Sequence, residues 1–147
     1  MPQSFMDDAL AEARAAQGAD EVPVGCVIVC DGAVIARAGN RTLRDRDPTA
    51  HAEILAIRTA AGVLGTERLT DCDLYVTLEP CTMCTAAISF ARIRRLYYGA
   101  RDPKGGAVEN GVRFFASPTC HHRPEVYGGI GESEAGALLK DFFKARR

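Results

Sequence analysis

Apolar and polar positions recur with two different periods along the chain, and the first of them is helical. Between residues 5 and 18, apolar side chains return every three or four positions with charged residues between them; they are Phe5, Met6, Ala9, Leu10 and Ala13. This spacing predicts an amphipathic helix that ends near Gly18 and covers one face of a sheet.

The following segment has the composition of a buried strand and a hairpin. Residues 24–30 are almost wholly apolar, and residues 33–38 return after the turn-forming pair Asp31-Gly32. Cys26 and Cys30 lie an even number of positions apart, so we expect both on one core-facing side. Asn40 comes next. Its position alone favours a role in the turn over a role as hydrogen-bond donor and acceptor at a site.

Two further helices are predicted, each after an extended segment. We expect Thr49 to cap a helix that carries His51 in its first turn, has Ile54, Leu55 and Ile57–Ala61 on its apolar side, and runs to about Gly62. After a short strand at 74–78, Pro80 suits the first position of a second helix, which runs to about residue 93. The remaining pattern predicts strands at 96–99 and 112–115 and a closing helix over 132–147.

Two short stretches, His51-Ala52-Glu53 and Pro80-Cys81-Thr82-Met83-Cys84, hold the residues that carry chemistry. Cysteines three positions apart at a helix start share one face, and an imidazole from another helix supplies a third ligand. Three nitrogen and sulfur ligands with an open fourth position are typical of a catalytic zinc, whereas a structural zinc usually has four protein ligands. We therefore predict one zinc ion per chain, bound by His51, Cys81 and Cys84, and no second site at Cys120-His121-His122.

Glu53 distinguishes a catalytic site from a plain metal site. On a helix, a residue two positions beyond His51 points about 200° away, so we do not expect Glu53 to share the metal. It is instead placed to flank the open position and carry protons for a water whose pKa zinc lowers to about 7. His-x-Glu with Pro-Cys-x-x-Cys is a mark of zinc nucleobase deaminases. A redox Cys-x-x-Cys pair would need neither His51 nor Glu53.

Composition indicates the size of the domain, its general charge and the cellular compartment. The chain of 147 residues, 47% hydrophobic and 25% charged, predicts a single globular domain over 1–147. Its net charge of −1 gives no general attraction to polyanions, so RNA contact would need a local basic patch. No signal peptide and no membrane-spanning stretch is recognised, and the six cysteines are irregularly spaced, so we expect a cytoplasmic protein with no membrane association.

The order of these elements and motifs resembles the cytidine deaminase-like zinc fold, and within it the bacterial tRNA-specific adenosine deaminases. The matching stretches are Glu21–Gly25, Asn40-Arg41, Pro48–Ile54, Leu74–Cys81, Tyr98–Asp102 and Leu138–Phe143. The resemblance implies a three-layer α-β-α fold, with a central mixed five-stranded sheet flanked by helices. The chain departs from many relatives at Ala86-Ala87, and residues 117–129 match the family loosely.

The same resemblance implies hydrolytic deamination of adenosine to inosine at the wobble position of a tRNA anticodon, by a zinc-activated water. It makes Glu53 the proton shuttle. By this likeness Asn40 touches the flipped base and Val22 lines its pocket, with Ala52 and Pro80 as further substrate contacts. Phe143 and the basic C-terminal end would meet the flanking nucleotides. The expected partners are the tRNA anticodon stem-loop and a second copy of the chain, with the helix at 81–92 near the homodimer interface.

Two other functions fit parts of the pattern. A free nucleobase or nucleoside deaminase, acting on guanine or cytosine, would use the same zinc site without RNA. A tRNA-binding zinc module without catalysis would not need Glu53. Apart from the family resemblance, only the basic clusters at 92–95 and 144–147 weigh against the first alternative, and such clusters more often stabilise helix ends than bind nucleic acid.

Overall fold

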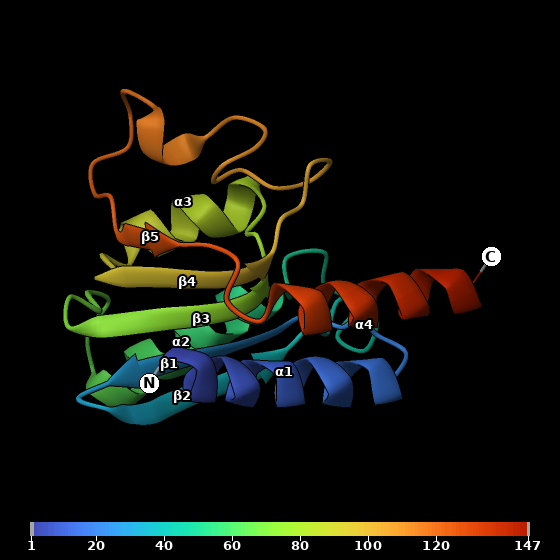
Figure 1. Cartoon of the computed structure of the whole chain (residues 1–147). Coiled ribbons are helices and arrows are strands. Elements are labelled where there is room, and N and C mark those ends of the chain that lie inside the picture. The colour runs from blue at the N-terminus through green and yellow to red at the C-terminus, as the bar shows by residue number, and fades with distance from the viewer. Residues whose placement is uncertain (1, 147) are drawn as a thin grey trace.

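Five strands form one mixed sheet at the centre of the computed structural model, which describes residues 2–146, with side chains described from residue 5 (Figure 1). The sheet has the order β2-β1-β3-β4-β5. β1 is antiparallel to both of its neighbours, whereas β3, β4 and β5 are parallel. The strands are β1 Gly25–Cys30, β2 Ala33–Gly39, β3 Cys72–Leu78, β4 Arg95–Ala100 and β5 Glu125–Tyr127.

Four α-helices cover the sheet on both faces, which confirms the expected three-layer fold. α1 and α4 pack on one face, and α2 and α3 on the other (Figure 1). Within residues 2–146, no helix is long and apolar enough to cross a membrane. The α-helices are α1 Pro2–Gly18, α2 Ala52–Leu64, α3 Thr82–Phe90 and α4 Glu132–Ala145, and a short 3-10 helix spans Phe114–Ala116.

The central strands are apolar throughout because both of their faces are buried. Along β1, Cys26 and Ile28 pack toward α2 and α3, whereas Val27 and Val29 pack toward α1. Cys30 also packs against the α2 side, so the two cysteines share a face as predicted. The hairpin turn follows the prediction too. Asp31 and Gly32 have φ angles of 51° and 75°, the conformation of a two-residue type I′ turn.

Three tyrosines stack across β3, β4 and β5 on the α1 and α4 face. Tyr75, Tyr97 and Tyr127 lie at the same register, with ring centroids 4.4 Å and 5.0 Å apart. Stacked cross-strand aromatic pairs each stabilise a sheet by up to about 1 kcal/mol. The stack therefore helps to hold the three-residue strand β5, which the sequence pattern did not predict, against β4.

Both site helices begin later than the sequence predicted. Thr49 does not cap α2, because the Asp47 carboxylate accepts both the Thr49 N–H (2.8 Å) and the Thr49 hydroxyl (2.7 Å). The N-cap of α2 is His51, whose backbone is extended. Pro80 is likewise not the first helical residue, since the N-cap of α3 is Cys81 and that helix ends at Phe90.

Two other expectations were wrong in detail. Residues 112–115 do not form a strand. The 3-10 helix begins at Phe114, and Phe115 packs into the core on the α2 and α3 side. The buried face of α2 consists of Ala52, Glu53, Ala56 and Ala60, whereas Ile54 and Leu55 are only half-buried. Small residues bring α2 close to the sheet, and the larger apolar side chains lie at the margin of the interface.

Close packing of α1 on β1 makes Gly25 sensitive to substitution. A Cβ atom at this position would lie 2.0 Å from the carbonyl oxygen of Ala9 and 2.5 Å from the Ala13 nitrogen. We expect Gly25→Ala to lower the free energy of unfolding by roughly 3 kcal/mol, because overpacking a close contact forces the backbones apart. Thermal or urea unfolding measures the effect.

Gly136→Ala is the matched control, because a Cβ at this helical position meets nothing within 4 Å. It should stabilise the protein by about 0.5–1 kcal/mol through higher helix propensity. Equal stability changes of the same sign in both variants would contradict the assignment of Gly25 to a close helix–strand contact.

Candidate active site

The N-termini of α2 and α3 meet at the carboxyl end of β3. His51 and Cys81 are the N-cap residues of the two helices, and Cys84 lies three residues into α3. The backbone is extended at each N-cap, and the side chains of His51 and Cys81 approach one another between the two helices. Helix N-termini favour negative charge, which suits thiolates at Cys81 and Cys84.

His51, Cys81 and Cys84 have the separations that a tetrahedral zinc ion requires. The Nδ1 atom of His51 lies 3.6 Å from the Cys81 sulfur and 3.5 Å from the Cys84 sulfur. Tetrahedral bonds of ordinary Zn–N and Zn–S length place nitrogen and sulfur about 3.6 Å apart. Among the described residues, these three form the one group of histidine, cysteine and acidic side chains close enough to share a metal ion. Their soft donor atoms suit zinc.

The two cysteines have opposite pKa shifts because they share a hydrogen bond. A hydrogen bond from the Cys84 thiol lowers the pKa of Cys81 to about 4, against the opposing effect of burial. The same contact with Cys81, together with burial, raises the pKa of Cys84 far above its ordinary value. The pair therefore holds one negative charge at neutral pH, and binding a metal through both sulfurs requires Cys84 to lose its proton.

Glu53 faces the same cavity as His51, although the two do not share a helix. Because His51 precedes α2, the expected 200° separation does not apply. Glu53 is 4% exposed, and burial raises the pKa of its carboxyl group to about 7. A carboxyl group with a pKa near neutrality can both take and give a proton, which is the property required of a general acid–base residue.

A cavity of about 180 Å³ lies in front of these groups, and two of the predicted substrate contacts line it. Val22 forms part of its wall, and Asn40 lies beside His51 and Glu53. The Asn40 side-chain oxygen accepts the N–H of Ala52 (3.3 Å), which satisfies the first turn of α2. Asn40 therefore has a structural role, and its amide N–H groups remain for a ligand.

The other predicted substrate contacts lie outside the lining of this cavity. Ala52 is fully buried behind Asn40. Pro80 is buried, and its carbonyl oxygen accepts the N–H of Ala107 (2.9 Å) and the hydroxyl of Thr85 (3.2 Å). Phe143 lies on α4, 47% exposed, at an adjoining groove.

The rest of the cavity lining was not predicted from the sequence and consists of Val24, Leu78, Glu79, Asp102 and Gly105. Asp102 and Gly105 belong to the loop after β4. The signal that could have found them is their place after a parallel strand, because sites in α/β sheets form at the carboxyl ends of such strands.

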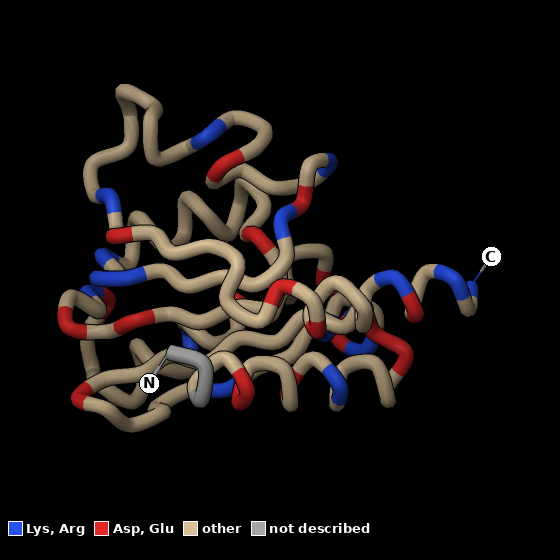
Figure 2. Tube along the Cα trace, viewed as in Figure 1, with Lys and Arg blue, Asp and Glu red and all other residues tan. Residues whose placement is uncertain are grey.

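The small cavity opens into a groove of about 850 Å³, with Val22, Leu78, Asp102 and Gly105 common to both. Three basic residues, Arg101, Lys104 and Arg146, lie along the groove, and Leu139 and Phe143 supply an apolar side. Arg101 pairs with Glu109 (3.0 Å) and Glu132 (2.9 Å), and Arg146 pairs with Asp20 (3.0 Å), all at exposed positions where such pairs are weak. Basic residues mark the loop after β4 and the C-terminal part of α4 in Figure 2. Arg147, the last residue of the predicted basic end, lies outside the described residues.

The basic cluster at 92–95 does not belong to this site. Arg94 donates two hydrogen bonds to the Asp73 carboxylate (3.0 Å and 3.1 Å), and Arg95 pairs with Asp73 and Glu125. These pairs lie at the start of β4, whereas the cavity lies beyond the opposite end of that strand. The cluster therefore gives no support for RNA over a small-molecule substrate.

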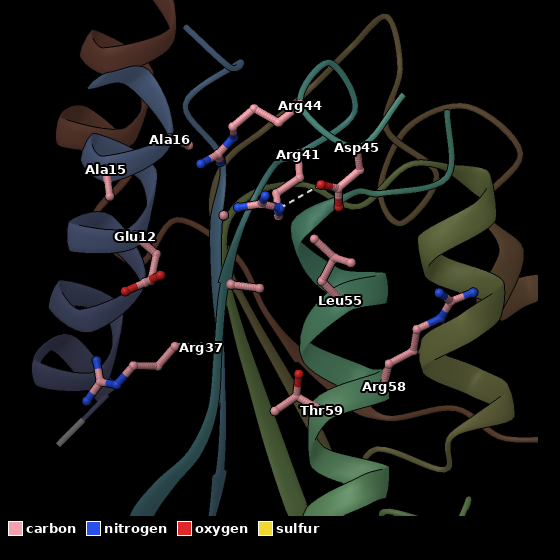
Figure 3. A pocket seen from close by; sticks show the side chains of 12 residues that line it. Glu12, Ala15, Ala16, Arg37, Arg41, Arg44, Asp45, Leu55, Arg58 and Thr59 are labelled. Atoms are coloured by element: carbon pink, nitrogen blue, oxygen red, sulfur yellow. Dashed lines mark hydrogen bonds and ion pairs between the residues drawn. The ribbon is translucent and has the colours of Figure 1, made fainter. Parts of the chain in front are cut away.

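A separate hollow of about 500 Å³ lies over the edge strand β2, between α1 and α2 (Figure 3). Its lining is charged, but Arg41 pairs with Asp45 (3.0 Å) and Arg44 with Glu21 (3.3 Å). Arg37 and Arg58 extend away from its centre (Figure 3). No histidine or cysteine lines this hollow, so it lacks the groups on which the chemistry depends.

The sequence profile of the cytidine and deoxycytidylate deaminase zinc-binding region matches residues 1–100. Together with the fold and the nitrogen and sulfur donor set, this match defines a zinc-binding deaminase. The tRNA-specific adenosine deaminase of Agrobacterium fabrum is 67% identical over 143 residues, which cover 97% of this chain and 94% of the relative. The chain belongs to the family of bacterial tRNA-specific adenosine deaminases, as its motifs predicted.

Solved structures agree with this placement. A structure from a study of A-to-I editing by tRNA:A34 deaminases at the wobble position of transfer RNA superposes with a TM-score of 0.91. It is 68% identical and is matched over 92% of this chain and 99% of that one. The guanine deaminase of Nitrosomonas europaea is more distant, with 28% identity and a TM-score of 0.80 over 97% of this chain and 84% of the other.

Proposed function

We propose that this protein converts adenosine to inosine at the wobble position of a tRNA anticodon. The observation that carries the proposal is a small reactive cavity that opens into a larger groove with basic and apolar sides. The cavity admits a base, and the groove admits the nucleotides joined to it. The high identity to tRNA-specific adenosine deaminases supports the same substrate. All six cysteines are free thiols, which fits a cytoplasmic enzyme.

The proposed reaction uses one metal ion, three side chains that bind it and a fourth that transfers protons. His51, Cys81 and Cys84 would bind zinc, one ion per chain, and when bound it supplies a water of lowered pKa. Glu53 takes one proton from the attacking water and gives it to the ring nitrogen. It then takes the second proton from the oxygen newly bonded to the ring carbon and delivers it to the amine as the C–N bond breaks. Water and adenosine thereby give inosine and ammonia. Positioned proton transfer of this kind typically contributes about 10²–10⁴ in rate.

Replacing Glu53 should separate catalysis from metal binding. We expect Glu53→Gln to keep about one zinc per chain and the wild-type fold, while turnover falls about 100-fold or more because the proton carrier is lost. Metal analysis and single-turnover assays measure the two effects. Cys84→Ser is the matched control and should lose most of its zinc together with activity, because it removes one metal ligand. Loss of zinc from Glu53→Gln would instead make Glu53 a ligand.

The groove suits a base splayed out of an RNA loop. A base inside a duplex cannot reach a buried cavity, so deaminases act on single-stranded or flipped bases. Phe143 offers an exposed ring on which a neighbouring base can stack. Arg146 lies over the ring of Phe142 (3.6 Å to the centroid) and also pairs with Asp20 (3.0 Å), and these contacts hold its guanidinium group along the groove.

Substrate assays test the proposal directly. We expect deamination of the wobble adenosine in an anticodon stem-loop, with free adenine, guanine and cytosine turned over poorly because they leave the groove empty. RNA binding should weaken steeply as salt rises. The double variant Lys144→Ala/Arg146→Ala should keep its zinc and bind RNA more weakly, with a salt slope reduced by about 2. Rapid reaction of guanine or cytosine, with no reaction of the stem-loop, would assign the chain to the small-molecule deaminases.

We further propose that two copies of the chain associate through the face made by α2 and α3. A hollow of about 370 Å³ separates these helices, with an apolar lining that includes Ile54, Ile57, Ala87 and Phe90. Phe90 is 70% exposed at the end of α3. An exposed ring beside an apolar hollow is an arrangement that a second copy can cover.

A charge at Phe90 should therefore break the dimer. We expect Phe90→Glu to sediment as a monomer at concentrations where the wild type is dimeric, because the carboxylate would be buried without a partner. Leu43→Glu, at a 69% exposed position outside this face, is the matched control and should leave the dimer intact. A monomeric wild type, or a Phe90→Glu variant that remains dimeric, would refute this interface.

A further inference from the structure

The loop over residues 101–110 forms one wall of the reactive cavity without belonging to any helix or strand. Asp102 and Gly105 line the small cavity, and Lys104 lines the adjoining groove. The shape of the cavity mouth therefore depends on whatever holds this loop in place.

One buried carboxylate, that of Glu79, accepts hydrogen bonds from several residues of the 101–110 loop. Glu79 is 2% exposed, and its two oxygens accept five hydrogen bonds from the loop. Oε1 accepts the Asp102 N–H (3.0 Å) and the Asn110 side-chain amide (2.7 Å). Oε2 accepts the backbone N–H groups of Val108 (3.1 Å), Glu109 (2.9 Å) and Asn110 (3.1 Å).

A carboxylate can satisfy five N–H donors with one side chain because both of its oxygens accept hydrogen bonds. All five groups that face the carboxylate are N–H donors, two at Oε1 and three at Oε2. This surrounding suits a carboxylate, whose oxygens only accept hydrogen bonds. Gly106 completes the fit, because a Cβ there would lie 2.5 Å from the Glu79 carboxyl carbon.

Glu79 also joins the loop to the metal-binding segment of the chain. It directly precedes Pro80 and Cys81, and the Pro80 carbonyl oxygen accepts the Ala107 N–H (2.9 Å). The loop is thus attached to the peptide that carries Cys81, on both sides of the Glu79–Pro80 bond. A displacement of Glu79 would change the distance between the cavity wall and the sulfur of Cys81.

We propose that Glu79 is a positioning residue that fixes the 101–110 loop relative to Cys81 and so sets the width of the cavity mouth for a nucleotide held in an RNA strand. This inference rests on the proposed function, because only a strand-bound nucleotide must contact the mouth and the groove together. Val24, Asn40 and Glu53 line the inner cavity from other segments. A loosened loop should therefore weaken RNA engagement more than it slows the chemical step.

Glu21 offers a matched comparison on another segment. It is fully buried, and its carboxylate accepts the N–H groups of Leu43 (3.2 Å) and Arg44 (2.8 Å) and the Arg44 side chain (3.3 Å). It fixes the loop after Asn40 in the same manner, but its hydrogen bonds go to Leu43 and Arg44 and not to residues 101–110. The same Glu→Gln substitution at either position introduces an amide opposite backbone donors in a different loop.

The experiment compares Glu79→Gln with Glu21→Gln in the zinc-bound, full-length protein. Leaving a buried donor unsatisfied typically costs enough to change an equilibrium about 10-fold or more. We expect Glu79→Gln to raise KM for the anticodon stem-loop by about 10-fold or more while kcat falls by less than about threefold. Hydrogen exchange should accelerate at residues 102–110 and not in β1 or β3. Glu21→Gln should leave exchange at 102–110 unchanged.

A second variant with a milder change tests the same proposal if Glu79→Gln does not fold. Asn110→Ala removes one donor and should raise KM about threefold, with faster exchange confined to the loop. Unchanged KM and unchanged exchange in the folded variant would overturn the proposal. So would a fall in kcat that only follows the loss of folded, zinc-bound protein. Exchange needs no RNA, so a wild type that is inactive on the stem-loop would refute the proposed function and still leave Glu79 tested.

Discussion

The chemistry of this protein depends on two helix N-termini that meet beyond the end of one buried strand. β3 is covered on both faces, so its direction is fixed by the core. α3 starts just beyond the end of β3, and the start of α2 is tied to the end of β2 because the Ala52 N–H donates to the Asn40 side-chain oxygen. The backbone positions of His51 and Cys81 are therefore set by the two helix starts and the core on which they pack. A ligand set on fixed N-caps avoids the ordering cost that a set on mobile loops would carry.

Around this fixed centre, the walls of the cavity are loops shaped by buried charge. Glu21 and Glu79 each direct several N–H groups of one loop at a single carboxylate. Buried carboxylates are costly unless such donors surround them. The reactive groups of the inner cavity are thus placed by helix ends, whereas its walls and the outer groove are formed by loops, strand ends and α4. Base identity and RNA context can be recognised by separate sets of residues.

The sequence predicted those features that depend on residues close together in the chain. Periodicity located α1, β1 and the hairpin at Asp31-Gly32, and the spacing of Cys81 and Cys84 indicated the donor set that the structure brings together with His51. Features that depend on distant contacts were not predicted. Asp47 rather than periodicity decides where α2 begins, three-residue β5 depends on stacking by Tyr127, and the role of Glu79 arises from donors more than twenty positions away. Contacts between residues far apart in the sequence leave no pattern in the residues next to each of them.

The shared proton of the two cysteines has a consequence for the handling of the protein. Cys81 is partly accessible, and its lowered pKa keeps its sulfur a thiolate at neutral pH even before the second cysteine ionises. Burial instead raises the pKa values of Cys26 and Cys72. Thiolates react with peroxides far faster than thiols do. A chain stripped by a chelator would therefore present a reactive sulfur at Cys81, and reductant would preserve its ability to bind the metal again.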